Sequence, residues 1–555
     1  MVAYDPALFD IRRFSAKGTH QKPAVKSIAV LGGGITGLAA AFFAHRKFPQ
    51  AQITLFEVSN RLGGVIDSLA VDAGGGREII CETGPRTLRA NAARSIVTVD
   101  LLNSLGKHLP LSNLLFTPRS SVSACSRYIF HPPSPVPLPP SIVMGLKSAH
   151  AILTHPFFDG GVSGIFRDTF LAQRPQNVAE AGDESIRSFA TRRFGQRIAD
   201  HVIAPLIAHG LYAGDADRLS ARTLLPGMWD AETRAEERGG LGRGVVGEML
   251  LGHFHARKRE AELLERLRKG TAGDLEKLLF RDVAWFSFKR GVADLTRALE
   301  AALQEKAHVI SIEKGSRVES ISKCQDGTLL VTTQTFTHVI ATTPLNSLLS
   351  MTSNPQSPTP THPDLSQESN SVMIVTLFYA SPAANHRYRG FGYLIPACIP
   401  HCWNPERALA VVFDSDAIDG QDAGPRGTKI SVVLGGHYWS AASQRSMSGL
   451  RGEGEERFPS RDEAVAMAKQ LLGRHIGLVD EPVVAVATLQ RDALPQYTVG
   501  HHARVARVRE WLLASFAGRL RVAGKSYGGI GVHDCVFSAR SVVEGLEVEN
   551  ETGLE

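Results

Sequence analysis

The chain has 555 residues, of which 43% are hydrophobic and 21% are charged. This length exceeds what one hydrophobic core supports and the composition excludes global disorder, so we expect two or three folded domains. The net charge of +6 is mildly basic, but no basic run with interleaved aromatic side chains occurs, which argues against a nucleic-acid partner.

Six cysteines are scattered along the chain, too few and too dispersed for a disulfide framework, so a reducing compartment is expected. Only Cys398 and Cys402 lie close together, with His401 between them, and no second pair completes a zinc site. We therefore expect no metal.

The first 26 residues form an N-terminal tail with five basic side chains, as transit peptides have. Asp5 and Asp10 depart from that pattern, so the tail is a possible targeting segment and no more. Residues 27–44 carry no charge and resemble a membrane-spanning helix in hydropathy alone. Three consecutive glycines weaken a helix there, and a strand, a turn and a short helix explain these residues better.

A strand at Ser27–Leu31, a helix at Ile35–Arg46 and a strand at Ile53–Glu57 predict the opening of a doubly wound sheet. The G-x-G-x-x-G sequence at 32–37 joins the first strand to the helix. Its glycines bend the chain, let the backbone approach a pyrophosphate and allow close helix–strand packing, while the helix N-terminus offers N–H groups to phosphates. An acid at Glu57 is placed to accept ribose hydroxyls. The dinucleotide-binding residues predicted here are Gly32, Gly33, Gly34, Ile35, Thr36, Gly37 and Glu57.

Arg61-Leu62-Gly63-Gly64 follows the second strand. It is either a plain turn, or Arg61 lies near the phosphates while the two glycines let the backbone pass close to the cofactor.

Residues 131–140 (HPPSPVPLPP) predict a rigid turn that is neither a helix nor a central strand. From about 150 to 280 the pattern favours helices, among them Ile186–Arg197 and Ala261–Arg268. Within this stretch, residues 231–245 are rich in Gly, Arg and Glu and are predicted as an exposed loop.

Strand patterns return at 308–343, where Gln325-Asp326-Gly327 is typical of a hairpin turn. Residues 353–370 are dense in small polar residues and proline, which predicts a flexible surface loop. Further strands are predicted at Val372–Tyr379, Leu409–Asp414 and Lys429–Leu434.

The C-terminal region carries a strand at Leu520–Ala523, a glycine-rich turn and a final helix from about Asp534. This turn, residues 522–532, ends a strand and leads into a helix, an arrangement that brings the chain back into contact with a bound dinucleotide. His533 beside Asp534 suggests an acid–base pair, but Asp534 fits a helix cap better.

The three glycine-rich segments together resemble those of the FAD-dependent oxidases that include amine oxidases, carotenoid desaturases and protoporphyrinogen oxidases. Other stretches resemble the protoporphyrinogen oxidase family specifically, and they follow its order along nearly the whole chain. Residues 231–280 and 353–370 are longer than in that family. The stretches are ETGPR (82–86), SRYI (126–129), SFA-x-x-R (188–193) with YAG (212–214), FGYLIP (391–396), LPQYT-x-GH (494–501) and AG-x-SY-x-G-x-GV-x-DC (523–535).

The resemblance implies an α/β fold with a doubly wound, Rossmann-like FAD-binding domain, a mixed-sheet substrate domain and a helical membrane-contact region. The expected bounds are 27–112 with 280–346 and 485–550 for the FAD-binding domain, 113–150 with 347–484 for the substrate-binding domain, and 151–279 for the helical region.

The implied activity is the oxidation of protoporphyrinogen IX to protoporphyrin IX in heme biosynthesis, with O2 as acceptor and H2O2 as product. The FAD carries the chemistry, so no catalytic side chain is assigned. Arg127 is expected to pair with a substrate propionate and Gly392 to lie beside the reacting ring. Apolar contacts with the ring are assigned to Leu394, Leu409 and Val433. Taken alone, Arg127 fits a surface ion pair, and the apolar three fit a plain core.

Further flavin contacts are expected outside the first turn, at Arg61, Gly63 and Gly64 from the second glycine segment itself and at the other positions from the resemblance. These residues are Arg61, Gly63, Gly64, Gly84, Pro85, Arg86, Thr87, Val318, Ala523, Gly524, Ile530, Gly531 and Val532.

The family implies a homodimer at the outer, intermembrane-space face of the mitochondrial inner membrane, and hand-over of product to the neighbouring heme-pathway enzyme. Apolar surface at about 150–230 is expected to contact the bilayer peripherally. One alternative is another oxidase or desaturase of the amine oxidase superfamily, although Cys535 follows His533-Asp534 and not the Ser-Gly-Gly of flavin-linking amine oxidases. A non-enzymatic relative without flavin is the other alternative, which the intact glycines disfavour.

Overall fold

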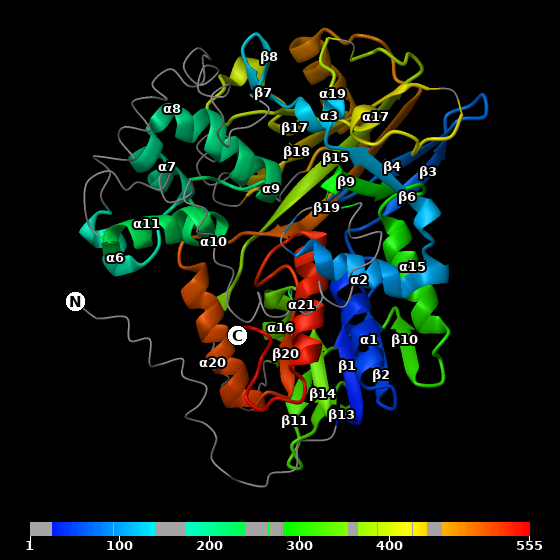
Figure 1. Cartoon of the computed structure of the whole chain (residues 1–555), viewed down its shortest axis with the longest axis vertical. Helices are drawn as coiled ribbons and strands as arrows, with labels where there is room; N and C mark the ends of the chain where they lie inside the picture. Colours follow the sequence, from blue (N-terminus) through cyan, green and yellow to red (C-terminus); the bar gives the residue numbers. More distant parts are fainter. Residues whose placement is uncertain are drawn as a thin grey trace.

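A five-stranded parallel sheet forms the base of the molecule, with the strand order β10-β2-β1-β14-β20 (Figure 1). The computed structural model describes residues 25–555 except 91, 93, 139–173, 239–264, 266–278, 280, 353–364, 386, 425 and 441–457. The sheet takes its strands from three distant stretches of the chain. They are β1 (Ser27–Leu31), β2 (Gln52–Glu57), β10 (Ile310–Lys314), β14 (His338–Ala341) and β20 (Leu520–Val522).

The central strand β1 is buried on both faces, which explains why it reads as a continuous apolar run. Ile28 and Val30 pack toward four helices, whereas Ala29 and Leu31 face a small antiparallel sheet and α20. The helices on the first face are α1 (Ile35–Lys47), α2 (Ser95–Leu105), α15 (Ala293–Gln304) and α21 (Val532–Glu544). The opposite face carries β11 (Ile321–Lys323), β12 (Leu329–Val331), β13 (Gln334–Phe336), α16 (Leu345–Thr352) and α20 (His501–Phe516).

A seven-stranded sheet lies above the parallel one in Figure 1, with the order β19-β15-β18-β17-β16-β7-β8. Neighbouring strands are antiparallel except β16 and β7, so the sheet is mixed. The helix α19 (Arg461–Ile476) packs against it. Its strands are β7 (Tyr128–His131), β8 (Ser134–Pro137), β15 (Ser369–Tyr379), β16 (Gly392–Leu394), β17 (Ala408–Phe413), β18 (Thr428–Gly435) and β19 (Val484–Pro495).

Two details of this sheet differ from the sequence expectation. Residues 134–137 of the proline-rich segment form the edge strand β8, where a missing N–H is tolerated because no further strand pairs there. The domain boundary expected between residues 484 and 485 falls at the start of β19, which pairs with β15 in this sheet.

Smaller elements connect the two sheets. Antiparallel β5-β9-β6 is tied to the upper sheet because Trp285 Nε1 and Thr117 Oγ1 both donate to the carbonyl of Ala417, at 2.8 and 2.9 Å. The remaining elements here are β3 (Ser68–Asp72), β4 (Glu78–Glu82), β5 (Leu88–Arg89), β6 (Leu114–Pro118), β9 (Val283–Phe288), α3 (Val122–Cys125), α17 (Asp414–Ala417), η3 (Gly106–His108), η4 (Leu111–Asn113), η9 (His401–Trp403) and η10 (Gly436–Trp439).

A helical lobe flanks both sheets (Figure 1).

The predicted helix at 186–197 is present as two helices broken at Gly195. The loop predicted at 231–245 is wrong for residues 231–238, which continue a helix. The segment 261–268 lies outside the described residues except Glu265, as do 1–24 and 353–364. The lobe consists of α6 (Gln176–Ala181), α7 (Ile186–Phe194), α8 (Gln196–Ile198), the π-helix η7 (Ala199–His209), α9 (Gly210–Tyr212), α10 (Ala221–Leu224) and α11 (Pro226–Arg238).

The helix α11 is rich in charged residues, and one of them belongs to a buried ion cluster. Glu232 is fully buried and pairs with Arg174, Arg192 and Arg193, while Trp229 packs against the core of the lobe. A charge-rich sequence reads as solvent-exposed, and only the tertiary partners make burial of this carboxylate favourable. Among the described residues, no helix is both long and apolar enough to cross a bilayer.

We expect Glu232→Gln to destabilise the protein at neutral pH and to matter less in acid. Burial opposes ionisation of Glu232, but the hydrogen bonds and charges of Arg192 and Arg193 outweigh it and lower its pKa to about 2. Between these two pKa values the Glu232 carboxyl binds a proton in the unfolded state but not in the folded state. The stabilisation that the ion cluster gives to the folded state is therefore lost as the pH falls from about 4.5 toward about 2. Breaking such a buried pair removes about 3–5 kcal/mol.

Chemical denaturation between neutral pH and about pH 3 measures this difference. The exposed Glu549→Gln is the matched control, which should follow the wild-type protein throughout. A destabilisation by Glu232→Gln that stayed constant with pH would contradict the assigned ion cluster.

Candidate functional site

The predicted glycine turn, residues 32–37, forms a cradle at the start of α1. Gly32 has φ of +102° and donates its N–H to the carbonyl of Phe56 at 2.8 Å, which bends the chain out of β1. A Cβ on Gly37 would lie 1.8 Å from the carbonyl oxygen of Gly32, so helix and strand touch there. A Cβ on Gly34 would meet no protein atom within 4 Å. Among the described residues, therefore, nothing fills the space in front of Gly34, which leaves room for a bound group.

The N-terminus of α1 fits a phosphate group. Within the part of the chain that the structure describes, no side chain caps it and no acid stands in its first turn, so the N–H groups of Ile35, Thr36 and Gly37 and the positive end of the helix dipole can receive an anion. Together with the open space at Gly34, this matches the pyrophosphate of a dinucleotide.

Glu57 ends β2 beside the cradle, as the sequence predicts. Its Oε2 accepts the N–H of Gly33 at 2.6 Å, and its Oε1 accepts the N–H and the hydroxyl of Ser59, each at 2.8 Å. These bonds fix the carboxylate and leave further lone pairs for ribose hydroxyls. Val318 follows β10, and its segment runs beside Glu57, because the Ser316 N–H donates to the Glu57 carbonyl at 2.9 Å.

The second glycine segment packs directly on the first. The N–H of Gly63 donates to the carbonyl of Gly33 at 2.8 Å, and a Cβ on Gly64 would lie 3.3 Å from the Cα of Gly34. Arg61 donates to the carbonyls of its own turn, including that of Gly64 at 2.5 Å. Its visible role is thus to hold this turn against the cradle.

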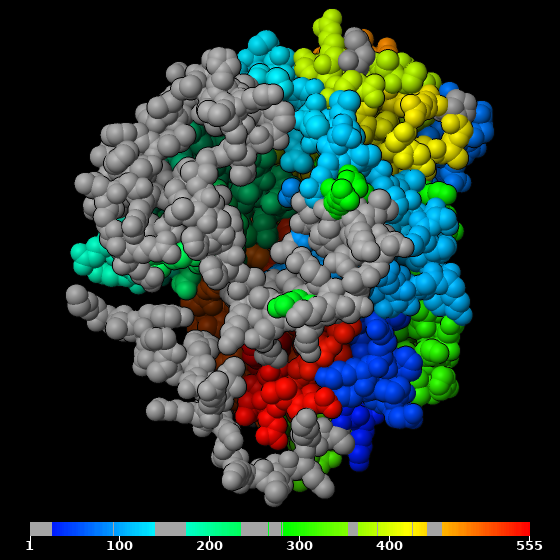
Figure 2. Space-filling model, in the orientation of Figure 1, coloured from blue at the N-terminus to red at the C-terminus, as the bar shows by residue number. Residues whose placement is uncertain are grey.

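The third glycine segment closes the cradle from the C-terminal side. Ala523 donates its N–H to the carbonyl of Ala341 at 3.1 Å, and a Cβ on Gly524 would lie 3.2 Å from the hydroxyl of Thr36. Figure 2 shows the red C-terminal segment beside the blue N-terminal one, in agreement with the packing of α21 on α1. The assigned residues Ile530, Gly531 and Val532 lead into α21.

Arg94, which the sequence analysis missed, holds this segment. Its guanidinium donates to the carbonyl of Gly528 at 2.8 Å and to Asp534 at 3.0 Å. Asp534 also accepts the N–H of Gly531 at 3.2 Å, so it caps α21 as predicted, although the helix begins earlier, at Val532. Burial lowers the pKa of His533 to about 4, and its ring bonds to Thr98 and to the carbonyl of Arg89, so His533 is a structural residue.

The segment Gly84–Thr87 joins the cradle to the upper sheet. A Cβ on Gly84 would lie 2.5 Å from the carbonyl of Val65. The Arg86 guanidinium forms a buried ion pair with Asp414 at 3.2 Å, and Ser431 donates to the same carboxylate at 2.5 Å. Arg86 therefore has its carboxylate partner within the protein. Pro85 and Thr87 flank it on the chain.

Apolar residues assigned to the substrate line up across three strands of the upper sheet. Leu394 on β16 and Val433 on β18 are both opposite Ala410 on β17, so the three side chains share one face. A register shift between Ala408 and Ala410 lets the neighbouring Leu409 join Val433 in one apolar cluster. We call Leu394, Leu409 and Val433 the apolar row.

Gly392 precedes the apolar row and cannot carry a side chain. Its φ is +137°, and a Cβ there would lie 2.1 Å from the carbonyl of Val411. The helical lobe reaches the row at Leu394, because a Cβ on Gly210 would lie 3.1 Å from that side chain.

Arg127 lies just before β7 with its guanidinium over an aromatic side chain. The Arg127 Cζ is 6.0 Å from the ring centre of Trp285, and Phe391 meets the same ring edge-on at 5.1 Å. Arg127 is exposed, and no carboxylate pairs with it within the described ranges. The surface ion pair considered from sequence is thus not found. Sequence reasoning missed Trp285, because an aromatic residue on a strand of buried neighbours carries no signal of its own.

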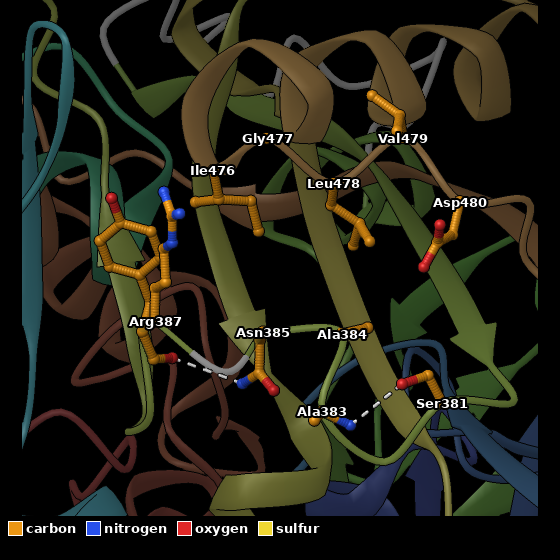
Figure 3. A pocket seen from close by; sticks show the side chains of 11 residues that line it. Ser381, Ala383, Ala384, Asn385, Arg387, Ile476, Gly477, Leu478, Val479 and Asp480 are labelled. Atoms are coloured by element: carbon orange, nitrogen blue, oxygen red, sulfur yellow. Dashed lines mark hydrogen bonds between the residues drawn. The ribbon is translucent and has the colours of Figure 1, made fainter.

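Elsewhere in the described part of the chain, two other features carry no site. A cavity of about 280 Å³ lies between the β15–β16 connection and the end of α19 (Figure 3), lined by Ser381, Asn385, Leu478 and Asp480 among others. None of its lining residues was predicted to bind anything. No group of three metal-ligating side chains occurs among the described residues, and Cys398 faces His201 at 3.5 Å and not Cys402.

Comparisons with known proteins agree with this geometry. Residues 30–105 match the family model of an NAD(P)-binding Rossmann-like domain. A protoporphyrinogen oxidase of Schizosaccharomyces pombe is 29% identical over 94% of this chain and 98% of its own length. A coproporphyrinogen III oxidase of Bacillus subtilis is 25% identical over 93% and 97%. A crystal structure from Exiguobacterium, provisionally assigned as a protoporphyrinogen oxidase, superposes with a TM-score of 0.68 at 23% identity over 95% and 99%.

Proposed function

We propose that this chain, a homologue of the protoporphyrinogen oxidases, oxidises protoporphyrinogen IX to protoporphyrin IX with a bound FAD and O2. The observation that carries the proposal is the similarity to the Schizosaccharomyces pombe enzyme over 94% of this chain. The open cradle at Gly34 and the apolar row fit a flavin dinucleotide and an apolar macrocycle respectively.

The cofactor assignment follows from what each segment offers. A dinucleotide fold is supported by the Rossmann-like match, the flavin by the similarity to protoporphyrinogen oxidases, and the adenine dinucleotide form by the free helix N-terminus and Glu57. When bound, FAD supplies the two-electron oxidising capacity that no side chain has. The protein's part is to hold the pyrophosphate at Gly32–Gly37, the ribose at Glu57 and the remaining ring system between the second and third glycine segments.

The apolar row and Arg127 serve to orient the substrate. Burial of a large macrocycle against the partly exposed Leu394 and Val433, with Leu409 buried behind Val433, supplies most of the binding free energy, because apolar area removed from water stabilises by about 25 cal/mol per Å². Apolar contact alone does not select one orientation of the macrocycle within its plane. A single carboxylate bound at Arg127 fixes which edge of the ring enters first.

The histidines beside the apolar row are structural. Burial lowers the pKa of His209 to about 4, and its Nδ1 lies 3.1 Å from the carbonyl of Ile395. Burial likewise lowers the pKa of His437, whose ring stacks on His209 at 4.9 Å. Both rings are therefore neutral at physiological pH, so we assign no side chain as a general base, in keeping with an oxidation carried by the cofactor.

Aerobic incubation of the purified protein with protoporphyrinogen IX tests the proposal. We expect porphyrin fluorescence to rise faster than it does by autoxidation without the protein. Three H2O2 should form per porphyrin, because six electrons leave the substrate in three pairs. Coproporphyrinogen III, run in parallel, tests the activity named for the Bacillus subtilis relative. Oxidation of coproporphyrinogen alone, or of neither compound, would overturn the proposal.

Peripheral membrane contact, a homodimer, the mitochondrial location and hand-over of product stay predictions from the resemblance. Flotation with liposomes and sedimentation velocity test the first two, and the absence of binding or of a dimer would reject them.

A further inference from the structure

A second arginine borders the aromatic ring under Arg127. Arg89 is the last residue of β5 and is paired in register with Trp285 of β9. Side chains of directly opposed residues lie on the same face of a sheet, about 5 Å apart at Cβ. Leu88, which precedes it, is buried on the opposite face, so Arg89 is turned toward the Trp285 side, where it is exposed.

The two arginines influence each other electrostatically. Partial desolvation and the nearby charge of Arg89 lower the pKa of Arg127. Neither residue forms an ion pair with a carboxylate in the described part of the chain. Two like charges on one aromatic surface repel each other, and an incoming anion relieves the repulsion.

The position of Arg89 also places this pair next to the cofactor cradle. The carbonyl of Arg89 lies 2.9 Å from Nε2 of His533, directly after the third glycine segment. The Trp285 side chain donates to the carbonyl of Ala417 in α17, which connects β17 to β18 of the upper sheet. The arginine pair thus lies where the cradle side and the apolar-row side of the molecule meet.

We propose that Arg89 and Arg127 form a two-arginine site that binds both propionates of one tetrapyrrole, Arg89 taking the carboxylate that Arg127 does not reach. This inference rests on the proposed function and specifies its substrate class, a dicarboxylate with an apolar body. Arg86 is excluded from this role because Asp414 already occupies its guanidinium. Each arginine presents a planar fork that matches a carboxylate with two N–H···O bonds.

The test compares free-acid and esterified ligands. Wild-type protein, Arg89→Ala, Arg89→Lys and Arg127→Ala are titrated with protoporphyrin IX and with its dimethyl ester, following quenching of tryptophan fluorescence. We expect Arg89→Ala to weaken binding of the diacid about 10- to 100-fold, as loss of one charge-assisted contact does. Arg89→Lys should recover part of the loss. Binding of the dimethyl ester should change by less than about twofold, since no carboxylate remains to be bound.

Turnover gives the second measurement. With protoporphyrinogen IX, Arg89→Ala should raise KM by a similar factor while kcat falls much less, because the flavin is untouched. Arg426→Ala, whose partner Asp419 is equally exposed, is the matched control and should behave as wild type. Flavin content and thermal unfolding show that each variant is folded.

The outcomes separate the two proposals. Undiminished binding of the diacid by Arg89→Ala, or equal losses for diacid and diester, would overturn the two-arginine site even if the wild-type enzyme is active. A wild-type protein that binds the diacid through Arg89 but never oxidises protoporphyrinogen would leave the site standing and reject the proposed function.

Discussion

Protein carrying Gly34→Val is expected to fold normally and to purify without flavin. Gly34 has φ −72° and ψ 179°, a conformation that any L-residue adopts, and a Cβ there meets no protein atom within 4 Å. The apoprotein therefore accommodates valine. The side chain instead fills the space through which a pyrophosphate must approach the helix N-terminus. We expect flavin affinity to fall at least about a thousandfold, which corresponds to about 4 kcal/mol.

The ratio of visible flavin absorbance to protein absorbance measures this loss, and thermal unfolding of apoprotein prepared from both forms measures the fold. Gly473→Val in α19 is the control, because its Cβ would meet only ordinary contacts, the nearest at 3.6 Å. Gly37→Val gives the opposite pattern: its Cβ would overlap the Gly32 carbonyl, so it should unfold the domain itself. Full flavin occupancy in Gly34→Val would show that the cradle is not the cofactor site.

Arg127→Ala is expected to lower kcat/KM for protoporphyrinogen IX about thirty- to several-thousand-fold, the range for losing a charge-assisted contact of about 2–5 kcal/mol. The guanidinium stacks over Trp285 and has no carboxylate partner among the described residues, so it is free to take one from the substrate. Flavin binding should be unchanged, because Arg127 belongs to none of the three glycine segments.

Steady-state kinetics with Arg127→Ala and Arg127→Lys distinguish charge from shape. Lysine keeps the charge but loses the planar fork, so it should recover part of the loss. Arg426→Ala again serves as the control. A near wild-type kcat/KM for Arg127→Ala would make Arg127 an ordinary surface residue and remove the assigned orientation of the substrate.

The cofactor cradle was readable from sequence because its determinants are local. Gly32, Gly34 and Gly37 act through backbone geometry within one turn, and Glu57 follows at the end of the next strand. Such short-range patterns need no knowledge of the rest of the fold. The hairpin at 325–327 and the strands at 372–379, 409–414 and 429–434 were found for the same reason.

Residues whose roles depend on distant partners were misread or missed. The charges of α11 predicted a loop, because nothing in residues 231–238 reveals Arg192 and Arg193 on another helix. The protein contacts of Arg61 and Arg86, with carbonyls of the Arg61 turn and with Asp414 respectively, could not be read from the sequence, and the contacts of both residues with the cofactor stay predictions. An arginine has the same local signature in each role.

By itself, the sequence determined the Rossmann-like turn at the start of α1, which predicts a dinucleotide site, since a glycine turn specifies its own geometry and its own open space. Only the tertiary structure decided which side chains lie around the start of α1 and in the upper sheet. The apolar row exists because β16, β17 and β18 are neighbouring strands and a register shift in β17 brings Leu409 beside Val433. Arg89, Arg127 and Trp285 meet because three distant segments converge. Strand register is set by packing across the whole sheet, and a one-residue slip would turn each of these side chains to the other face, so no local pattern could have placed them.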